Sequence, residues 1–200
     1  KSFTHALVGK YQSRYREEAR MRIGLISFGN GELLDDGTVS PAITVSSLTD
    51  NLGEENGGVQ AAVNGMTYHK GFTNMAQAFA LAEKLLIIGS NPPRASQVQQ
   101  SVLVISDGLP SFAFQTEELV EQLDDKGVMR YFMVISSTIS KDQMHLITSW
   151  ASQPWESNVI HVPGLVQLGA DSDMWAQKAI SMFCPMALSP QQIDVTERTQ

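Results

Sequence analysis

Four short apolar segments, each ending at turn or polar residues, constrain the fold of this chain more than any other feature. They are Arg22–Phe28, Ser101–Ser106, Arg130–Ser136 and Val159–Val162. Segments of this length with nearly continuous apolar residues are typical of strands that are buried on both faces. Such strands occur mainly in parallel sheets that helices cover on both sides. The sequence therefore predicts an α/β fold.

Amphipathic helical patterns lie between the apolar segments. The first begins the chain, where Phe3, Leu7, Tyr11 and Tyr15 recur every four residues and form one apolar stripe. Further helices are predicted at residues 54–66, 75–86, 116–126, 140–152 and 175–183. Because helices and buried strands alternate, we expect a doubly wound α/β domain. Its central sheet should be mostly parallel, with right-handed crossovers and helices on both faces.

Local signals predict some of the boundaries. Thr116 is expected to cap the helix that follows it, and Gly127 is expected to end that helix. Ser140 and Gln143 fit a capping box, in which the side chain of each residue bonds the backbone of the other. Residues 39–48 mix β-branched residues with serine, so we expect a less buried strand there, at an edge of the sheet.

The composition limits the size of the domain and its partners. The chain has 200 residues, of which 42% are hydrophobic, and this suffices for one core. We expect one domain over residues 1–184 and a polar tail or linker over residues 185–200. A net charge of −7 argues against nucleic acid binding. The apolar segments are too short to insert into a membrane.

Asp107 and Thr73 are the candidate site residues. Asp107 directly follows the strand at Ser101–Ser106, and Thr73 precedes the helix predicted at residues 75–86. In an open parallel sheet, ligands bind in the crevice beyond the carboxyl ends of the strands, where both residues are expected to lie. Each has an ordinary structural alternative, because Asp-Gly also forms turns and threonine also caps helices. Together the two side chains predict an oxygen-ligand site.

Motifs for other chemistries are missing from the sequence or have simpler explanations. It contains no Gly-Lys-Ser/Thr phosphate loop and no GxSxG nucleophile motif. Asp171 and Asp173 fit the start of a helix, where acidic residues are favoured. The four histidines lie on separate predicted elements without ligand spacing; they are His5, His69, His145 and His161. We therefore expect a binding module and not an enzyme.

Three segments resemble the von Willebrand factor type A domain. Residues 22–29 are similar to the family's second strand, residues 71–79 to its threonine loop and following helix, and residues 102–110 to its aspartate strand and turn. The resemblance spans most of the chain and implies a Rossmann-like fold. It also implies a metal-ion-dependent adhesion site (MIDAS), with Thr73 and Asp107 as two of the ligands.

The resemblance further implies a divalent cation at that site and a protein partner. Mg²⁺ is the expected ion and Ca²⁺ and Mn²⁺ are the alternatives, since hard cations prefer hydroxyl, carboxylate and water oxygens. In this family an acidic side chain of the partner commonly completes the coordination. The family's first-loop motif, Asp-x-Ser-x-Ser, occurs nowhere in the sequence. We therefore expect that more protein precedes Lys1 and that the chain is part of a larger chain or assembly.

Two functions remain open under this resemblance. The first is cation-bridged adhesion to another protein, at an extracellular or cell-surface location. The second is a structural building block of a large extracellular or ciliary assembly, with the metal site unused. A cytoplasmic location is the alternative to both. Cys184 is the only cysteine. It is either a buried thiol or the partner of a cysteine upstream of Lys1, which would imply an oxidising compartment.

Overall fold

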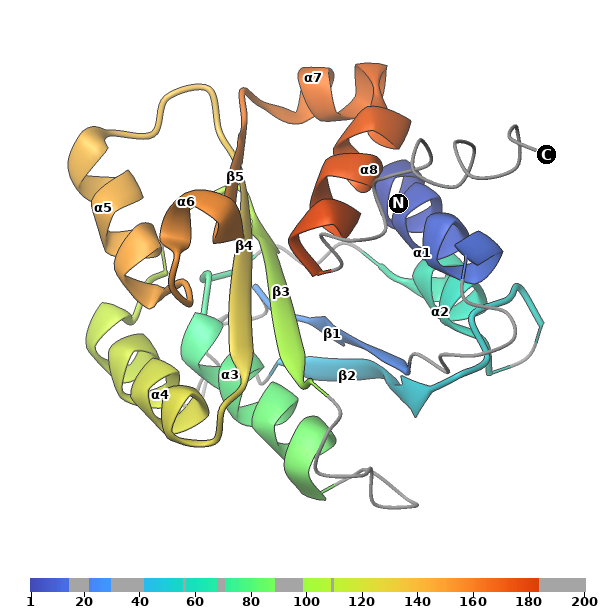
Figure 1. The fold of residues 1–200 in the computed structure, drawn as a ribbon, viewed down its shortest axis with the longest axis horizontal. Helices are drawn as coiled ribbons and strands as arrows, with labels where there is room; N and C mark the ends of the chain where they lie inside the picture. Colours follow the sequence, from blue (N-terminus) through green and yellow to red (C-terminus); the bar gives the residue numbers. More distant parts are fainter. Residues whose placement is uncertain are drawn as a thin grey trace, which may run out of the picture.

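Three parallel strands form the centre of the fold (Figure 1). The computed structural model describes residues 1–14, 22–29, 42–55, 57–67, 71–88, 99–108 and 110–183. One sheet contains β3 (Ser101–Ser106), β4 (Met129–Ile135) and β5 (Val159–Val162), in that order. Both neighbouring pairs are parallel. The carboxyl ends of all three strands therefore lie at the same edge, as the sequence predicts.

A second sheet contains two antiparallel strands. β1 (Ile23–Ser27) pairs with β2 (Ile43–Thr49), and the register is irregular near the start of β1. The prediction that helices and strands alternate throughout is wrong here, because the chain reverses between β1 and β2 instead of crossing over. The prediction of a less buried edge strand is confirmed, since β2 has exposed residues and pairs only with β1 among the described strands.

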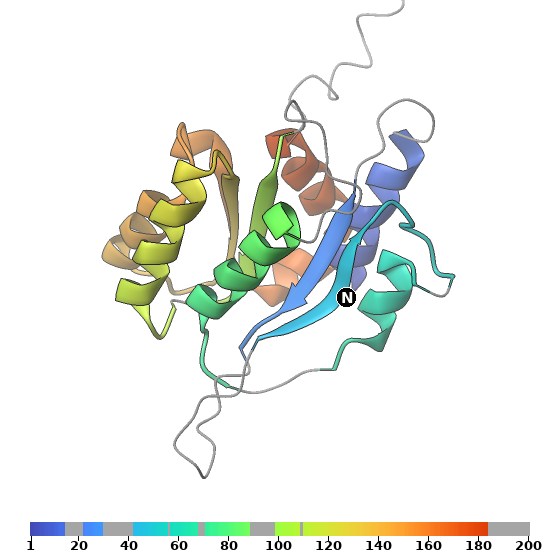
Figure 2. The same cartoon turned by 90° about the horizontal axis from the view of Figure 1, so that it is seen from below.

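Helices lie on both sides of the central sheet (Figures 1 and 2). On one side are α1 (Ser2–Arg14), α2 (Val59–Gly65), α7 (Leu165–Ala170) and α8 (Ser172–Phe183). On the other are α3 (Met75–Glu83) with its π-helical continuation η1 (Lys84–Ile88), α4 (Ala113–Asp125), α5 (Lys141–Trp150) and α6 (Trp155–Asn158). This arrangement confirms the doubly wound architecture. None of the described helices is long and apolar enough to cross a bilayer.

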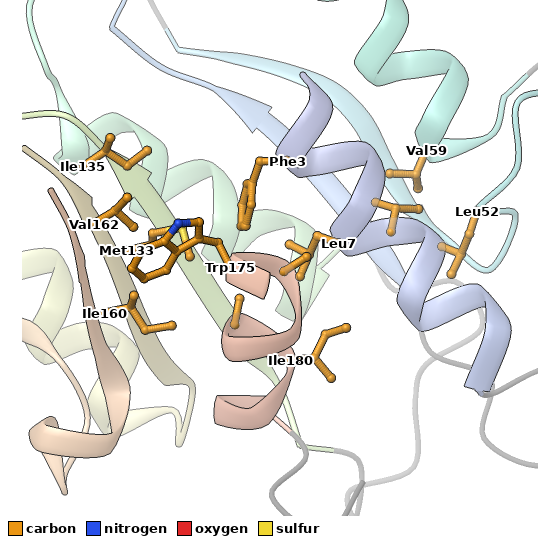
Figure 3. Packing of buried hydrophobic residues seen from close by; sticks show 13 residues of the cluster. Phe3, Leu7, Leu52, Val59, Met133, Ile135, Ile160, Val162, Trp175 and Ile180 are labelled. Atoms are coloured by element: carbon orange, nitrogen blue, oxygen red, sulfur yellow. The ribbon is translucent and has the colours of Figure 1, made fainter. Parts of the chain in front are cut away.

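Each face of the central sheet has its own hydrophobic core. Figure 3 shows the first core, in which α1 and α8 pack on β4 and β5. Its members include Phe3, Leu7, Met133, Ile135, Ile160, Val162, Trp175 and Ile180. The second core lies on the opposite face, between the sheet and helices α3, α4 and α5. Its members include Phe79, Leu123, Phe132, Val134, Ile147 and Trp150. β4 is thus buried on both faces, as its continuous apolar sequence predicts.

Local signals in the sequence predicted two helix boundaries correctly and a third wrongly. The capping box is confirmed. The backbone amide of Gln143 donates to Ser140 Oγ at 3.2 Å, and the backbone amide of Ser140 donates to Gln143 Oε1 at 2.9 Å. Gly127 follows the end of α4 with a φ of +69°, a conformation that favours glycine. Thr116 is not a cap. It is fully buried inside α4, and its hydroxyl donates to the Phe112 carbonyl at 2.8 Å.

Each of the two sheets has a strand edge that pairs with no other described strand, at β1 in one sheet and at β3 in the other (Figure 2). Among the described strands, β1 bonds only β2, and β3 bonds only β4. Ile23 of β1 and Leu103 and Ile105 of β3 nevertheless pack against the same core. All three are only partly buried, whereas every residue of β4 after its first is buried. The expected single sheet is therefore divided between β1 and β3.

Candidate functional site at the carboxyl edge of the parallel strands

Thr73 and Asp107 lie in two loops that contact each other. The Thr73 loop precedes α3, and the Asp107 loop follows β3. The Ser111 amide donates a hydrogen bond to the Thr73 carbonyl at 3.0 Å. The rings of Phe72 and Phe112 pack edge to face with their centroids 6.4 Å apart, and this contact also joins the two loops. The fold therefore brings the loops of both predicted site residues to one edge of the central sheet.

The hydroxyl of Thr73 does not cap α3. The cap is Asn74, which is 7% exposed and whose Oδ1 accepts a hydrogen bond from the Gln77 amide at 3.2 Å. The Thr73 carbonyl accepts from two backbone amides. Its hydroxyl forms no hydrogen bond to any residue in the described part of the chain. The ordinary explanation of this threonine as a helix cap is therefore wrong, and its hydroxyl is available to a ligand.

The carboxylate of Asp107 likewise has no structural role in its turn. The turn is held by Ser106, whose Oγ accepts from the Gly108 amide at 3.3 Å and donates to the Gly108 carbonyl at 3.0 Å. Asp107 is exposed, and its side chain forms no hydrogen bond or ion pair within the ranges described above. An aspartate that merely stabilised the turn would accept backbone hydrogen bonds itself. Asp107 instead presents a free carboxylate at the strand end.

The other polar candidates have structural explanations. Asp171 Oδ1 accepts from the Met174 amide at 2.9 Å in the first turn of α8, which confirms its predicted capping role. Asp173 forms an ion pair with Lys10 of α1 at 3.1 Å. The predictions about three further features concern parts of the chain outside the described residues: His69, Cys184 and residues 185–200.

The two side chains suit a divalent cation chemically but do not complete its coordination. A threonine hydroxyl and an aspartate carboxylate are hard oxygen donors of the kind that Mg²⁺ binds. In the described ranges, no group of three or more histidine, cysteine, aspartate or glutamate residues could hold a metal ion. An octahedral ion at this edge therefore needs further oxygens, from water or from another segment.

The chain is thus an α/β domain with free oxygen donors at the carboxyl edge of its parallel strands, where ligands bind in such folds. A sequence model of the von Willebrand factor type A domain matches residues 1–170. The match covers most of the chain, and the chain belongs to this family. No curated protein matches its sequence.

Solved structures with the same fold include matrix and adhesion proteins. Proximal thread matrix protein 1 (PTMP1) from the mussel byssus matches with a TM-score of 0.63 at 14% identity, over 91% of this chain and 41% of that chain. A PTMP1 structure with a zinc-occupied MIDAS motif matches with a TM-score of 0.60 at 16% identity, over 88% and 39%. The pilus adhesin SpaC from Lactobacillus rhamnosus GG matches with a TM-score of 0.65 at 12% identity, over 91% and 27%.

Manganese-loaded TRAP protein from Plasmodium vivax is a further match. Its TM-score is 0.58 at 15% identity, over 92% of this chain and 63% of that chain. Identities this low show a shared fold and nothing finer. This chain spans about two fifths of the mussel protein and about a quarter of the pilus adhesin.

Sequence reasoning missed the residues that hold the two loops in place. Asn74 caps α3 and Ser106 holds the turn after β3. Signals for both were present, because asparagine is a better helix cap than threonine and serine before Asp-Gly favours a local turn. The contact between Phe72 and Phe112 had no such signal, since it joins residues far apart in the sequence.

Proposed function

We propose that this chain is a protein-binding module that engages its partner through a divalent cation held in part by Thr73 and Asp107. One observation supports the proposal above the others. Both residues lie in loops that contact each other at the carboxyl edge. Asn74 caps α3 in place of Thr73, and Ser106 holds the turn after β3 in place of Asp107. Binding sites typically contain a few positioned polar groups of this kind.

Mg²⁺ is the expected cation, and Ca²⁺ and Mn²⁺ are the alternatives. Thr73 supplies a neutral hydroxyl and Asp107 a carboxylate, either directly or through water. A bound cation would bridge to a carboxylate of the partner, so that binding depends on the ion and needs no catalytic step. Membership of the type A family supports this proposal, as do the zinc in the mussel protein and the manganese in the Plasmodium protein.

The remaining ligands come from an additional strand between β1 and β3. Both strands have an unpaired edge there among the described residues. Unpaired backbone groups at a buried edge cost free energy unless another strand or water satisfies them. Leu103 and Ile105 of β3 are partly buried, although the sequence of β3 is typical of a central strand. A strand parallel to β3 would cover them, and its carboxyl end, with an Asp-x-Ser-x-Ser motif, would lie beside Asp107.

A Mn²⁺ titration of the complete native protein, followed by NMR, tests the cation site. Paramagnetic Mn²⁺ broadens the signals of nearby nuclei, so the amides of residues 71–74 and 106–108 should broaden first. Asp107→Asn and Thr73→Val nearly keep the side-chain shapes, and each should weaken Mn²⁺ binding by about tenfold or more. Asp142→Asn is the matched control, because Asp142 is an exposed carboxylate in the first turn of α5. Broadening that Asp107→Asn leaves unchanged would contradict the site.

Selection from a phage-displayed library of random peptides tests the partner chemistry. The native protein is immobilised in Mg²⁺ buffer, and bound phage are eluted with EDTA. We expect the eluted peptides to be enriched in aspartate and glutamate, and we expect the Asp107→Asn variant to capture few of them. If EDTA releases no specific peptides, binding does not use a cation bridge.

A structural building block with an unused metal site is the second candidate function. It is favoured by the incomplete set of donors among the described residues and by the likeness to a matrix protein of the mussel byssus. The byssus and pilus proteins support an extracellular or cell-surface location for either function, with a cytoplasmic location as the alternative. Partner binding that survives both chelation and Asp107→Ala would favour this candidate.

A further inference from the structure

Two phenylalanines expose their rings beside the Thr73 and Asp107 loops. Phe114 is 81% exposed and lies in the first turn of α4, and Phe72 is 48% exposed and directly precedes Thr73. Phe112 connects the two positions, because its ring packs on Phe72 and it is the residue directly before α4. Single exposed apolar residues are ordinary on protein surfaces, whereas grouped ones mark binding surfaces. Phe72 and Phe114 thus add exposed apolar surface to the proposed partner-binding edge.

The outer face of α4 continues from Phe114 as a row of carboxylates. Glu117, Glu118, Glu121 and Asp125 follow Phe114 at helical spacing on the same face, and all four are exposed. The buried residues of α4 lie on the opposite face. None of the four carboxylates forms an ion pair with another described residue. Like charges four residues apart destabilise a helix slightly, so this row repels itself until a cationic group lies over it.

We infer that this face of α4, together with Phe72, binds a segment of the partner protein that is both apolar and basic. One large aliphatic or aromatic side chain lies against Phe114 and Phe72, and two or more lysine or arginine side chains lie over Glu117 and Glu121. Charge complementarity selects this chemistry, because an acidic segment along α4 would be repelled. The inference rests on the proposed function, since it describes sequence that flanks the partner's cation-binding carboxylate.

Selection of random twelve-residue peptides on the complete native protein, in low-salt buffer with EDTA, tests the inference. EDTA removes the cation, so only the surface itself can capture peptides. We expect selected peptides to combine leucine, isoleucine or aromatic residues with lysine or arginine. A fluorescent copy of the most enriched peptide is then titrated with variants. Phe114→Ser should weaken its binding by about tenfold or more, as for a central interface aromatic.

Charge is tested with the double variant Glu117→Gln and Glu121→Gln. It should weaken the peptide severalfold at low salt, and this difference should disappear at high salt because exposed charges are screened. Leu165→Ser is the apolar control, since Leu165 is 66% exposed in the first turn of α7. Asp142→Asn is the charge control. Neither control should change the affinity.

Three outcomes would overturn the inference. They are a selection that yields no specific peptide, a selection that yields acidic peptides, and equal weakening by Phe114→Ser and Leu165→Ser. The proposed function fails separately, because the Mn²⁺ titration does not involve α4. A cation site without peptide selectivity contradicts the inference alone. Peptide capture in EDTA without a cation site contradicts the proposed function and leaves the apolar and basic selectivity of α4 established.

Discussion

Arg130 provides a sharp test of what stabilises this fold. Its side chain is buried and donates three hydrogen bonds, two of which join the start of β4 to α4 and α5. Nε donates to the Trp150 carbonyl and Nη1 to the Val128 carbonyl, both at 3.0 Å. Nη2 donates to Asp124 Oδ1 at 2.6 Å. Arg130→Met keeps most of the apolar stem and removes every donor, so it isolates the contribution of these bonds.

The two carbonyls should account for most of the loss. Val128 and Trp150 are almost completely buried, so their carbonyls lose their partners without gaining water. Each such orphaned acceptor costs about 1–3 kcal/mol, which predicts a loss of about 2–6 kcal/mol for Arg130→Met. The carboxylate of Asp124 is 70% exposed and stays hydrated when the ion pair is broken. We therefore expect Asp124→Asn to cost less than about 1 kcal/mol.

Urea unfolding followed by far-UV circular dichroism measures both values. A lower midpoint with an unchanged slope reports a loss of stability without a change in the unfolded state. Lys126→Met, which breaks the exposed ion pair between Lys126 and Glu83, is the control and should cost less than about 1 kcal/mol. The reasoning is refuted if Asp124→Asn destabilises as much as Arg130→Met, because the ion pair would then carry the stability.

Two further predictions concern the helices around the second core. Trp150 Nε1 is buried and has no hydrogen-bond partner among the described residues, so Trp150→Phe removes an unsatisfied donor as well as volume. It should cost about 1–2 kcal/mol by urea unfolding, and a loss as large as the roughly 3–5 kcal/mol expected for Phe132→Ala would contradict this. Ser140→Ala removes the capping box of α5 and should lower the free energy of unfolding by about 1 kcal/mol. Ser149→Ala, at an exposed serine in the same helix, should have little effect, and equal losses at both serines would exclude a capping role.

Much of the fold follows from local patterns. The bounds of β3 and β5 are the predicted ones, and the capping box at Ser140 is present. Both predictions depend on the spacing of apolar residues or on a few adjacent positions, which act over one turn or one strand. The prediction for Thr116 failed because a threonine hydroxyl can be satisfied in two ways. It can cap the turn that follows, or it can donate to a carbonyl of the preceding turn, as it does to the Phe112 carbonyl at the start of α4. Propensity alone does not distinguish these two positions.

Pairing between distant segments was less predictable. The sequence indicates an edge strand at residues 39–48, where the structure has β2 at Ile43–Thr49, but not that β1 and β2 run antiparallel and apart from β3. An apolar strand can pair on either edge with similar local energy, so its neighbours depend on which other strands are available. The half-buried residues of β3 show the effect of that choice.

The sequence by itself determined the α/β class, the buried strand β4, and the positions of Thr73 and Asp107 next to a helix start and a strand end. Local hydrophobic spacing is sufficient for these features. Only the tertiary structure decided that Ser111 bonds the Thr73 loop, that Asn74 and Ser106 leave both candidate side chains free, and that Phe114 is exposed. The Ser111 bond and the exposure of Phe114 depend on residues far apart in the chain. Which of two adjacent residues caps a helix or holds a turn depends on how the loops pack.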